Sequence, residues 1–297
     1  TSFSFIPTAI RFEDRITLNH EKINPPAYPD SLEERYEIIN RADLTFGITK
    51  RIRFRGTFDT RYVNKNEDKL FKLKGETALT FDYTDDYFNP TKGVRVAPTV
   101  GAGTNLNANL EKLTMIGNPY TYGEATVNLY HPLFWTFYGA LSGSVGRFFE
   151  KALEDDARVF YQGGSRSVRG YRFRSIFASY ESYTTSTDDD GNEVIDTVIN
   201  TGLTPMYLRI NEEIRWTLPW KGWRHWQIVQ FYDWTRVMDN ERDLYKETAK
   251  EALGLGLRYR WQFLTFRLDY AFKKNLSDWS PEGFAWGRFA FDLSQTF

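Results

Sequence analysis

The chain contains no cysteine, only three histidines and no long apolar run. The absence of cysteine excludes disulfides and is compatible with a secreted or envelope protein that folds without them. No stretch approaches the ~20 apolar residues that a transmembrane helix requires. A net charge of −1 gives no electrostatic support for binding nucleic acid. The first residues, Thr1–Phe5, lack the basic and apolar regions of a signal peptide.

The scarcity of histidine also bears on catalysis. Some membrane barrels are hydrolases, and these need a histidine beside a nucleophilic serine. His131 and His225 fall in predicted turns at one end of the strands, which leaves only His20 for the other end. No zinc spacing, phosphate loop or flavin signature occurs, and the acidic run Asp188–Glu193 lacks the ligand spacing of a calcium loop. We therefore expect no enzyme activity, no metal and no cofactor.

Aromatic residues, in contrast, are abundant, with 24 Phe, 18 Tyr and 9 Trp, and many lie in alternating segments. In residues 51–62, apolar side chains share one strand face and arginines crowd the other. A soluble sandwich with one wet face would show the same period. Such a density of charge suits a water-filled lumen better, and a polar lumen also explains the mean hydropathy of −0.53. The tryptophans at 216, 220, 223 and 226 resemble an interfacial girdle.

Short and long connections alternate along the chain, as they do in outer-membrane barrels. The expected fold is an all-β, transmembrane, antiparallel β-barrel formed by residues 1–297 as one domain. An even strand count returns both ends to the periplasm and places the longest connection, residues 150–204, outside the cell. The pattern predicts about twelve strands, at residues 9–18, 36–49, 51–63, 70–86, 93–103, 120–131, 133–149, 205–218, 225–238, 252–262, 264–273 and 285–297.

The segment 160–171 stands out within that connection, because it is rich in glycine and arginine. Taken alone, it could equally be a solvated basic loop. A second stretch, 231–237, places Asp233 among aromatic residues beginning with Phe231, where a carboxylate is costly unless a cation meets it. Arginine is the planar candidate. The candidate residues of the loop are Gly163, Gly164, Arg166, Val168, Arg169, Gly170 and Tyr171.

At these residues the chain resembles the outer-membrane assembly-factor superfamily, which includes the BamA, TamA and two-partner secretion transporter barrels. The resemblance implies that the Val-Arg-Gly-Tyr tip folds into the lumen and that Asp233 holds Arg169. Thr235 stands where the family usually has glycine. Further matches, in the expected order, are Phe88–Gly93, Gly254–Arg258, Arg267–Ala271 and the terminal strand Phe289–Phe297, so the resemblance covers roughly residues 75–297.

Better-known relatives have sixteen strands and periplasmic helper domains. The chain therefore resembles a naturally short member without such domains, or else the C-terminal part of a sixteen-stranded barrel. The resemblance implies a bacterial outer-membrane protein that inserts other barrels or translocates polypeptides. Expected partners are outer-membrane lipid, nascent outer-membrane or secreted proteins, and a separate periplasmic partner or a second copy in a homodimer. The alternative is a passive barrel or pore that kept the fold without the activity.

The two ends of the sheet carry a further expectation. In the last strand Phe289, Phe291 and Leu293 should face outward, ahead of the terminal Phe297. The first strand lies close to Pro7, and proline cannot donate to a ladder. We therefore expect the ladder that closes the barrel to be shorter than the others. We also expect Arg169 and Asp233 to form a buried pair, so that charge reversal at both positions together recovers folding better than either single change.

Overall fold

A computed structural model gives the structure of the chain. Among the residues it describes, no helix is long and apolar enough to cross a membrane. The described residues are 10–23, 33–65, 68–87, 89–107, 115–149, 160, 162–172, 175–176, 179–187, 193–201, 206–238, 249–261, 264–274 and 284–295.

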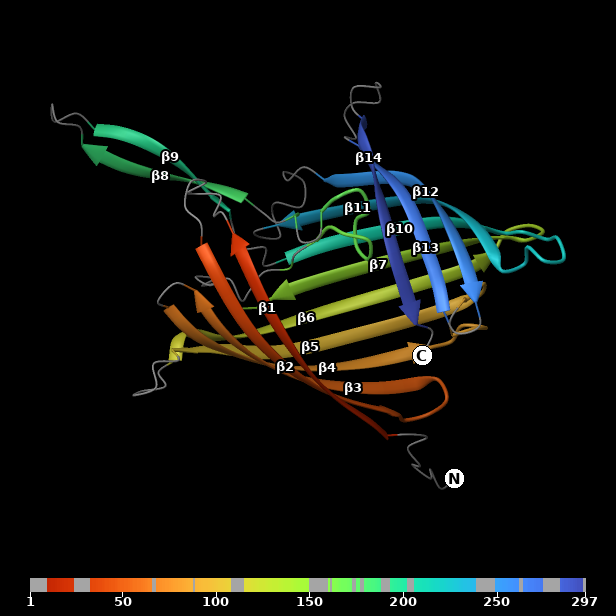
Figure 1. Ribbon diagram of the computed structural model, residues 1–297, viewed down its shortest axis with the longest axis horizontal. Helices are drawn as coiled ribbons and strands as arrows, with labels where there is room; N and C mark the ends of the chain where they lie inside the picture. Colours follow the sequence, from red (N-terminus) through yellow and green to blue (C-terminus); the bar gives the residue numbers. More distant parts are fainter. Residues whose placement is uncertain are drawn as a thin grey trace.

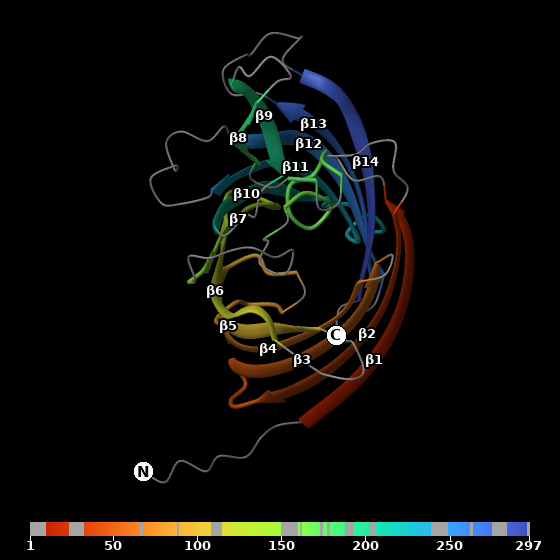
Figure 2. The same ribbon diagram turned by 90° about the vertical axis from the view of Figure 1, so that its left-hand side faces the viewer.

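Twelve antiparallel strands form one sheet that curves around a lumen (Figures 1 and 2). This confirms the predicted all-β fold and its strand count. The strands of this sheet, in spatial order, are β1 (Ile10–Ile23), β2 (Glu33–Gly47), β3 (Ile52–Lys65), β4 (Asp68–Asp82), β5 (Gly93–Asn107), β6 (Met115–Pro132), β7 (Phe137–Phe148), β10 (Met206–Thr217), β11 (Trp226–Met238), β12 (Lys250–Trp261), β13 (Leu264–Lys274) and β14 (Phe284–Gln295).

The period-two pattern of the sequence decides which side chains face the lumen. Alternate residues of β1, including Phe12 and Leu18, leave 68% and 73% of their surface exposed on the outer face. The inner wall carries charged and hydroxyl groups instead. Arg41 donates to Asp59 at 2.8 Å, and Arg95 and Tyr122 make comparable bonds to acids of β4. This is the charged lumen that distinguishes a barrel from a sandwich.

One prediction was wrong within the connection 150–204, which was expected to lack strands. Within it, β8 (Ser179–Thr187) and β9 (Glu193–Thr201) form a separate two-stranded sheet, paired from Ser179↔Thr201 to Thr187↔Glu193. Serine and threonine dominate β8 and give it the composition of a loop, although threonine and tyrosine also favour strands. This two-stranded sheet projects beyond one end of the barrel, opposite to the end where β1 starts and β14 finishes (Figure 1). The acidic run 188–192 between its strands lies outside the described residues.

Several strands are also longer than predicted. β1 continues to Ile23 rather than ending at residue 18, and β6 begins at Met115 rather than at residue 120. The added residues include Asn19, His20 and Asn118, which read as loop residues. Ladder pairing with β2 holds Asn19 and His20 in place, and such pairing does not depend on side-chain type. Asn118 instead lies at the register shift between β5 and β6.

The twelve-stranded sheet has two edges, β1 and β14. A ladder joins each strand to the next one along the sheet, but no ladder joins β1 to β14 among the described residues. Each edge strand pairs on its inner side. β1 matches β2 over its whole length from Ile10↔Phe46 to Ile23↔Glu33, and β14 pairs with β13 with one register shift between Ala271 and Lys273. The sequence predicted a closing ladder shorter than the others. The described residues form no closing ladder, so its length stays a prediction.

The turn between β4 and β5 crosses the lumen at the end where β1 starts. Asn89 Oδ1 accepts hydrogen bonds from Gln227 of β11 at 3.2 Å and from the Tyr138 hydroxyl of β7 at 3.3 Å. Asp85 organises the turn by accepting from the backbone amides of Thr91 at 2.9 Å and Lys92 at 3.0 Å. This turn belongs to the Phe88–Gly93 motif, of which Phe88 lies outside the described residues.

The turn gives a pH-dependent prediction. Burial alone would raise the pKa of Asp85, but hydrogen bonds from the Thr91 hydroxyl and from the Lys92 and Thr91 amides lower it from 3.8 to about 2. A depressed folded-state pKa adds stability above the unfolded value, and that stability is lost as the pH falls from about 4 toward 2. Because the carboxylate is exposed and solvent screens it, Asp85→Asn should destabilise the barrel by no more than roughly 1 kcal/mol at pH 7.

The measurement is urea unfolding of both proteins in detergent at pH 7 and pH 2. The difference between wild type and Asp85→Asn should be present at pH 7 and largely absent at pH 2. Asp86→Asn, at the neighbouring carboxylate that accepts from the Asn89 amide at 3.0 Å, gives a comparison within the same turn. A difference between wild type and Asp85→Asn that is equal at both pH values would contradict the assigned role.

Candidate functional site: a loop anchored in the lumen

The glycine- and arginine-rich segment enters the barrel and lies inside the ring of strands (Figure 2). Reciprocal backbone hydrogen bonds of 3.0 Å between Gln162 and Ile176 close its base. Gly163 has φ +102°, and an added Cβ would lie 2.5 Å from the Arg172 carbonyl oxygen, so the tight entry turn requires glycine. The Ser167 hydroxyl accepts from the Gly163 amide at 2.6 Å and completes the turn.

Apolar packing holds the loop against the wall. Phe160 packs in a tilted arrangement against Phe148 of β7 at a centroid distance of 4.5 Å and edge-to-face against Tyr207 of β10 at 5.0 Å. Val168, fully buried, belongs to the same cluster. Gly170 has φ +88°, and an added Cβ would lie 3.3 Å from the Ala271 Cβ. The tip of the loop therefore fits closely against β12 and β13.

Arg169 reaches Asp233, which is the contact that the sequence predicted. Its Nε donates to Asp233 Oδ2 at 2.7 Å, its Nη2 donates to Oδ1 at 2.6 Å, and its backbone amide donates to Oδ2 at 2.9 Å. The guanidinium also lies 3.5 Å from the centroid of the Phe231 ring. Arg169 is 3% exposed and Asp233 is fully buried, so this bidentate pair is removed from water.

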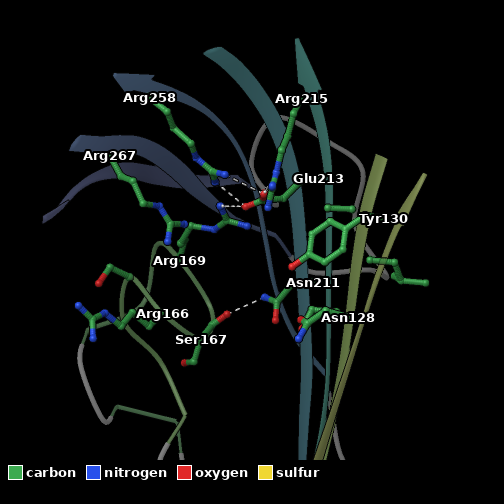
Figure 3. A pocket seen from close by; sticks show the side chains of 14 residues that line it. Asn128, Tyr130, Arg166, Ser167, Arg169, Asn211, Glu213, Arg215, Arg258 and Arg267 are labelled. Atoms are coloured by element: carbon green, nitrogen blue, oxygen red, sulfur yellow. Dashed lines mark hydrogen bonds and ion pairs between the residues drawn. The ribbon is translucent and has the colours of Figure 1, made fainter. Parts of the chain in front are cut away.

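Two further carboxylates meet Arg169, and the sequence analysis did not single them out. Its Nη1 donates to Glu213 of β10 at 2.8 Å and to Asp269 of β13 at 3.3 Å. Glu213 in turn accepts hydrogen bonds from Arg215 at 2.7 Å and from Arg258 at 2.6 Å. The loop arginine therefore belongs to a charged network that spans four strands (Figure 3).

A signal for Glu213 was present in the sequence. Alternate residues of β10, from Tyr207 through Arg209 and Asn211 to Arg215, are all polar or aromatic, as expected of a face turned to the lumen. Asp269 lies within the Arg267–Ala271 match. Which of these residues meet the loop depends on the registers of strands far apart in sequence, and the pattern alone does not contain that information.

The remaining candidates take varied positions. Arg166 is 73% exposed and donates to Asp292 of β14 at 3.1 Å, so it links the loop to the last strand. Gly164 donates its amide to the Val168 carbonyl at 3.2 Å. Tyr171 packs against the apolar cluster, with Lys273 Nζ lying 4.8 Å from its ring centroid.

Thr235, at the position where the family usually has glycine, is fully buried and donates its hydroxyl to the Leu208 carbonyl at 3.0 Å. This side chain therefore fits, because its only polar group is satisfied by the neighbouring strand.

The terminal strand faces outward as expected where its side chains are described. Phe289 is 72% exposed and Phe291 is 66% exposed on the outer surface. The backbone of Leu293 pairs with Phe266 of β13. The Leu293 side chain and Phe297 lie outside what the structure describes.

A transmembrane antiparallel barrel with an arginine-tipped loop held inside its lumen defines a class of outer-membrane protein. Residues 29–297 match the family model of the Omp85 superfamily domain, so the chain belongs to the Omp85 superfamily. The sequence-based resemblance is thus confirmed at family level, and the chain is a protein of the bacterial outer membrane. No curated protein matches the chain in sequence.

Solved structures show the same fold at low sequence identity. A BamA from Haemophilus ducreyi lacking POTRA domains 1–3 superimposes with a TM-score of 0.61 at 12% identity, over 96% of this chain and 59% of that one. CdiB from Acinetobacter baumannii gives 0.55 at 10% identity, over 96% and 47%. CdiB from Escherichia coli gives 0.50 at 10% identity, over 96% and 48%. The chain thus spans about half to three fifths of the length of these proteins.

Proposed function

We propose that this chain is an outer-membrane assembly factor that templates strands of other membrane proteins at its β1 and β14 edges. The observation that supports this is the missing ladder between β1 and β14 among the described residues. An unpaired strand presents a row of amide and carbonyl groups, and an extended segment can add to such a row by β-augmentation. Membership of the Omp85 superfamily supports a role in protein insertion or translocation.

The membrane environment gives the unpaired edges a driving force. Hydrocarbon offers no water to backbone amides, so an open edge within it costs several kcal/mol for each unsatisfied group. The outer side chains of both edges, including Phe12, Ile16 and Phe289, are strongly exposed and apolar, which places these strands against lipid. A nascent outer-membrane strand would satisfy the free backbone groups. The first and last strands would then pair with the substrate instead of with each other.

Polypeptide translocation through the lumen is the second candidate. The lumen is an obvious path, but the loop occupies it, and Arg169 alone makes five side-chain or backbone hydrogen bonds to three carboxylates. A translocated chain would have to break this buried network before it passed. The geometry therefore favours action at the edges, with the loop fixed. The supply of substrates is a further proposal, and we assign it to a separate periplasmic partner or to a second copy of the chain.

Reconstitution tests the proposal. The purified protein would be inserted into liposomes, and a urea-denatured outer-membrane barrel would be added as substrate. Folding of the substrate, followed by its heat-modifiable mobility on gels, should be faster than in protein-free liposomes. Liposomes that carry a fully closed barrel of similar size provide the matched control, because they contain the same bilayer disturbance without open edges. Equal rates in both kinds of liposome would leave the passive-barrel reading as the better one.

A further inference from the structure

A polar cavity of about 200 Å³ lies between the inserted loop and the wall of the lumen (Figure 3). The loop contributes Ser165, Ser167, Arg166 and Arg169 to its lining. The wall contributes Asn128, Tyr130 and residues of β10, β12 and β13. Any molecule held here would therefore touch the loop and the barrel at the same time. The cavity is a separate feature from the Arg169–Asp233 contact, because Asp233 does not line it.

The charges around this cavity do not balance. Five arginines line it, at positions 166, 169, 215, 258 and 267, together with a single carboxylate, Glu213. Three more carboxylates pair with these arginines without lining the cavity themselves, namely Asp233, Asp269 and Asp292. Four carboxylates thus meet five guanidinium groups, which leaves an excess of one positive charge. Charges interact more strongly in such a confined site than in bulk water.

Arg267 carries the excess charge. Its nearest carboxylate oxygens are 3.7 Å away on Asp269 and 4.0 Å away on Asp292, both beyond normal hydrogen-bond length. Its Nε atom is buried without an acceptor among the described residues, and the same holds for the Nε of Arg258. Figure 3 shows the Arg267 side chain directed toward that of Arg169, and two cations so placed repel each other unless an anion lies between them.

We propose that this cavity binds a small oxyanion, of the phosphate, sulfate or carboxylate class, with Arg267 as its principal ligand. The planar guanidinium fork suits an oxyanion, and the side chains of Asn128, Tyr130 and Ser167 supply further donors around the cavity. Because the site includes both loop and wall, an anion that binds there stabilises the inserted position of the loop by mass action. This inference does not depend on the proposed insertase activity.

Calorimetric titration of the purified barrel in detergent tests it, with inorganic phosphate as the probe and sodium chloride at matched ionic strength as the reference. Wild type should bind phosphate saturably, with about one ion per chain. Arg267→Gln should weaken the affinity about tenfold or more, the effect of losing a hydrogen bond to a charged group. Arg55→Gln is the matched control, since Arg55 lies on the opposite wall near Glu76 and does not line the cavity.

A second readout follows the loop itself. The chain has no cysteine, so Ser165→Cys introduces a unique thiol on the loop. Phosphate should slow maleimide labelling of this thiol in the wild-type background and have no effect when Arg267→Gln is added. If Arg267→Gln does not fold, Arg267→Lys replaces it and should still bind more weakly, because lysine lacks the fork. Unsaturable binding, or equal affinities in the Arg267 and Arg55 variants, would mean an adventitious ion only and would overturn the proposal.

Discussion

Replacing Arg169 with alanine should destabilise the folded barrel by roughly 3–5 kcal/mol, the range for removing one partner of a buried ion pair. Asp233 is fully buried and would remain as an uncompensated charge. Glu213 and Asp269 would lose their shared partner as well. Urea unfolding in detergent, followed by tryptophan fluorescence, measures the change. Arg166→Ala is the matched control in the same loop, and because Arg166 is 73% exposed it should cost less than about 1 kcal/mol.

The network also predicts an asymmetry between the two partners. Asp233→Asn leaves Arg169 with two carboxylate partners, whereas Arg169→Ala removes one cationic partner from each of three carboxylates. Asp233→Asn should therefore lower the free energy of unfolding by less than Arg169→Ala does. Equal costs for the two substitutions would indicate an isolated pair and contradict the network. An Arg169→Ala protein within 1 kcal/mol of wild type would contradict the anchoring role altogether.

The structure revises one expectation drawn from the sequence. An isolated ion pair would tolerate exchange of its two charges, so that the double variant Arg169→Asp, Asp233→Arg would fold better than either single variant. In the structure, an aspartate introduced at position 169 would lie beside Glu213 and Asp269, where like charges repel. We therefore expect the double variant to be no more stable than Asp233→Arg alone.

Locking the seam should abolish assembly activity without unfolding the barrel. One cysteine placed near Ile16 of β1 and another near Leu293 of β14 would join the two edges, and the absence of native cysteine makes the crosslink unambiguous. The disulfide prevents the edges from separating, so no substrate strand can add to either. In the liposome assay the oxidised protein should fall to the rate of the closed-barrel control, and reduction should restore the wild-type rate.

Each single-cysteine variant controls for the substitution itself. Heat-modifiable mobility of the oxidised protein verifies that the barrel stays folded. Unchanged activity in the locked protein would show that lateral opening is not part of the mechanism.

The strands of the barrel could be predicted because the alternation that indicates each strand lies within that strand's own residues. Alternation in residues 51–62 shows a strand with one charged face, and that conclusion does not depend on the rest of the chain. The contact between Arg169 and Asp233 could also be predicted, because each residue lies in a recognisable motif.

Other features could not be predicted because they depend on long-range geometry. Glu213 and Asp269 reach Arg169 only because β10, β11, β12 and β13 pair in particular registers and curve around the loop. The two-stranded sheet of β8 and β9 was missed for a different reason, since its serine- and threonine-rich composition is shared by loops. The reach of Asn89 to Gln227 across the lumen depends on the curvature of the whole sheet.

Amide hydrogen exchange of the barrel in lipid bilayers tests the open seam most directly. Among the described residues, amides that point outward from the edges β1 and β14 have no ladder partner, whereas those of inner strands such as β6 and β7 are paired on both sides. An open seam lets water of the polar lumen reach these unpaired amides, so the account predicts that about half of the amides of β1 and β14 exchange much faster than those of β6 and β7. Protection of β1 and β14 equal to that of β6 and β7 would show a fully paired seam and contradict the account.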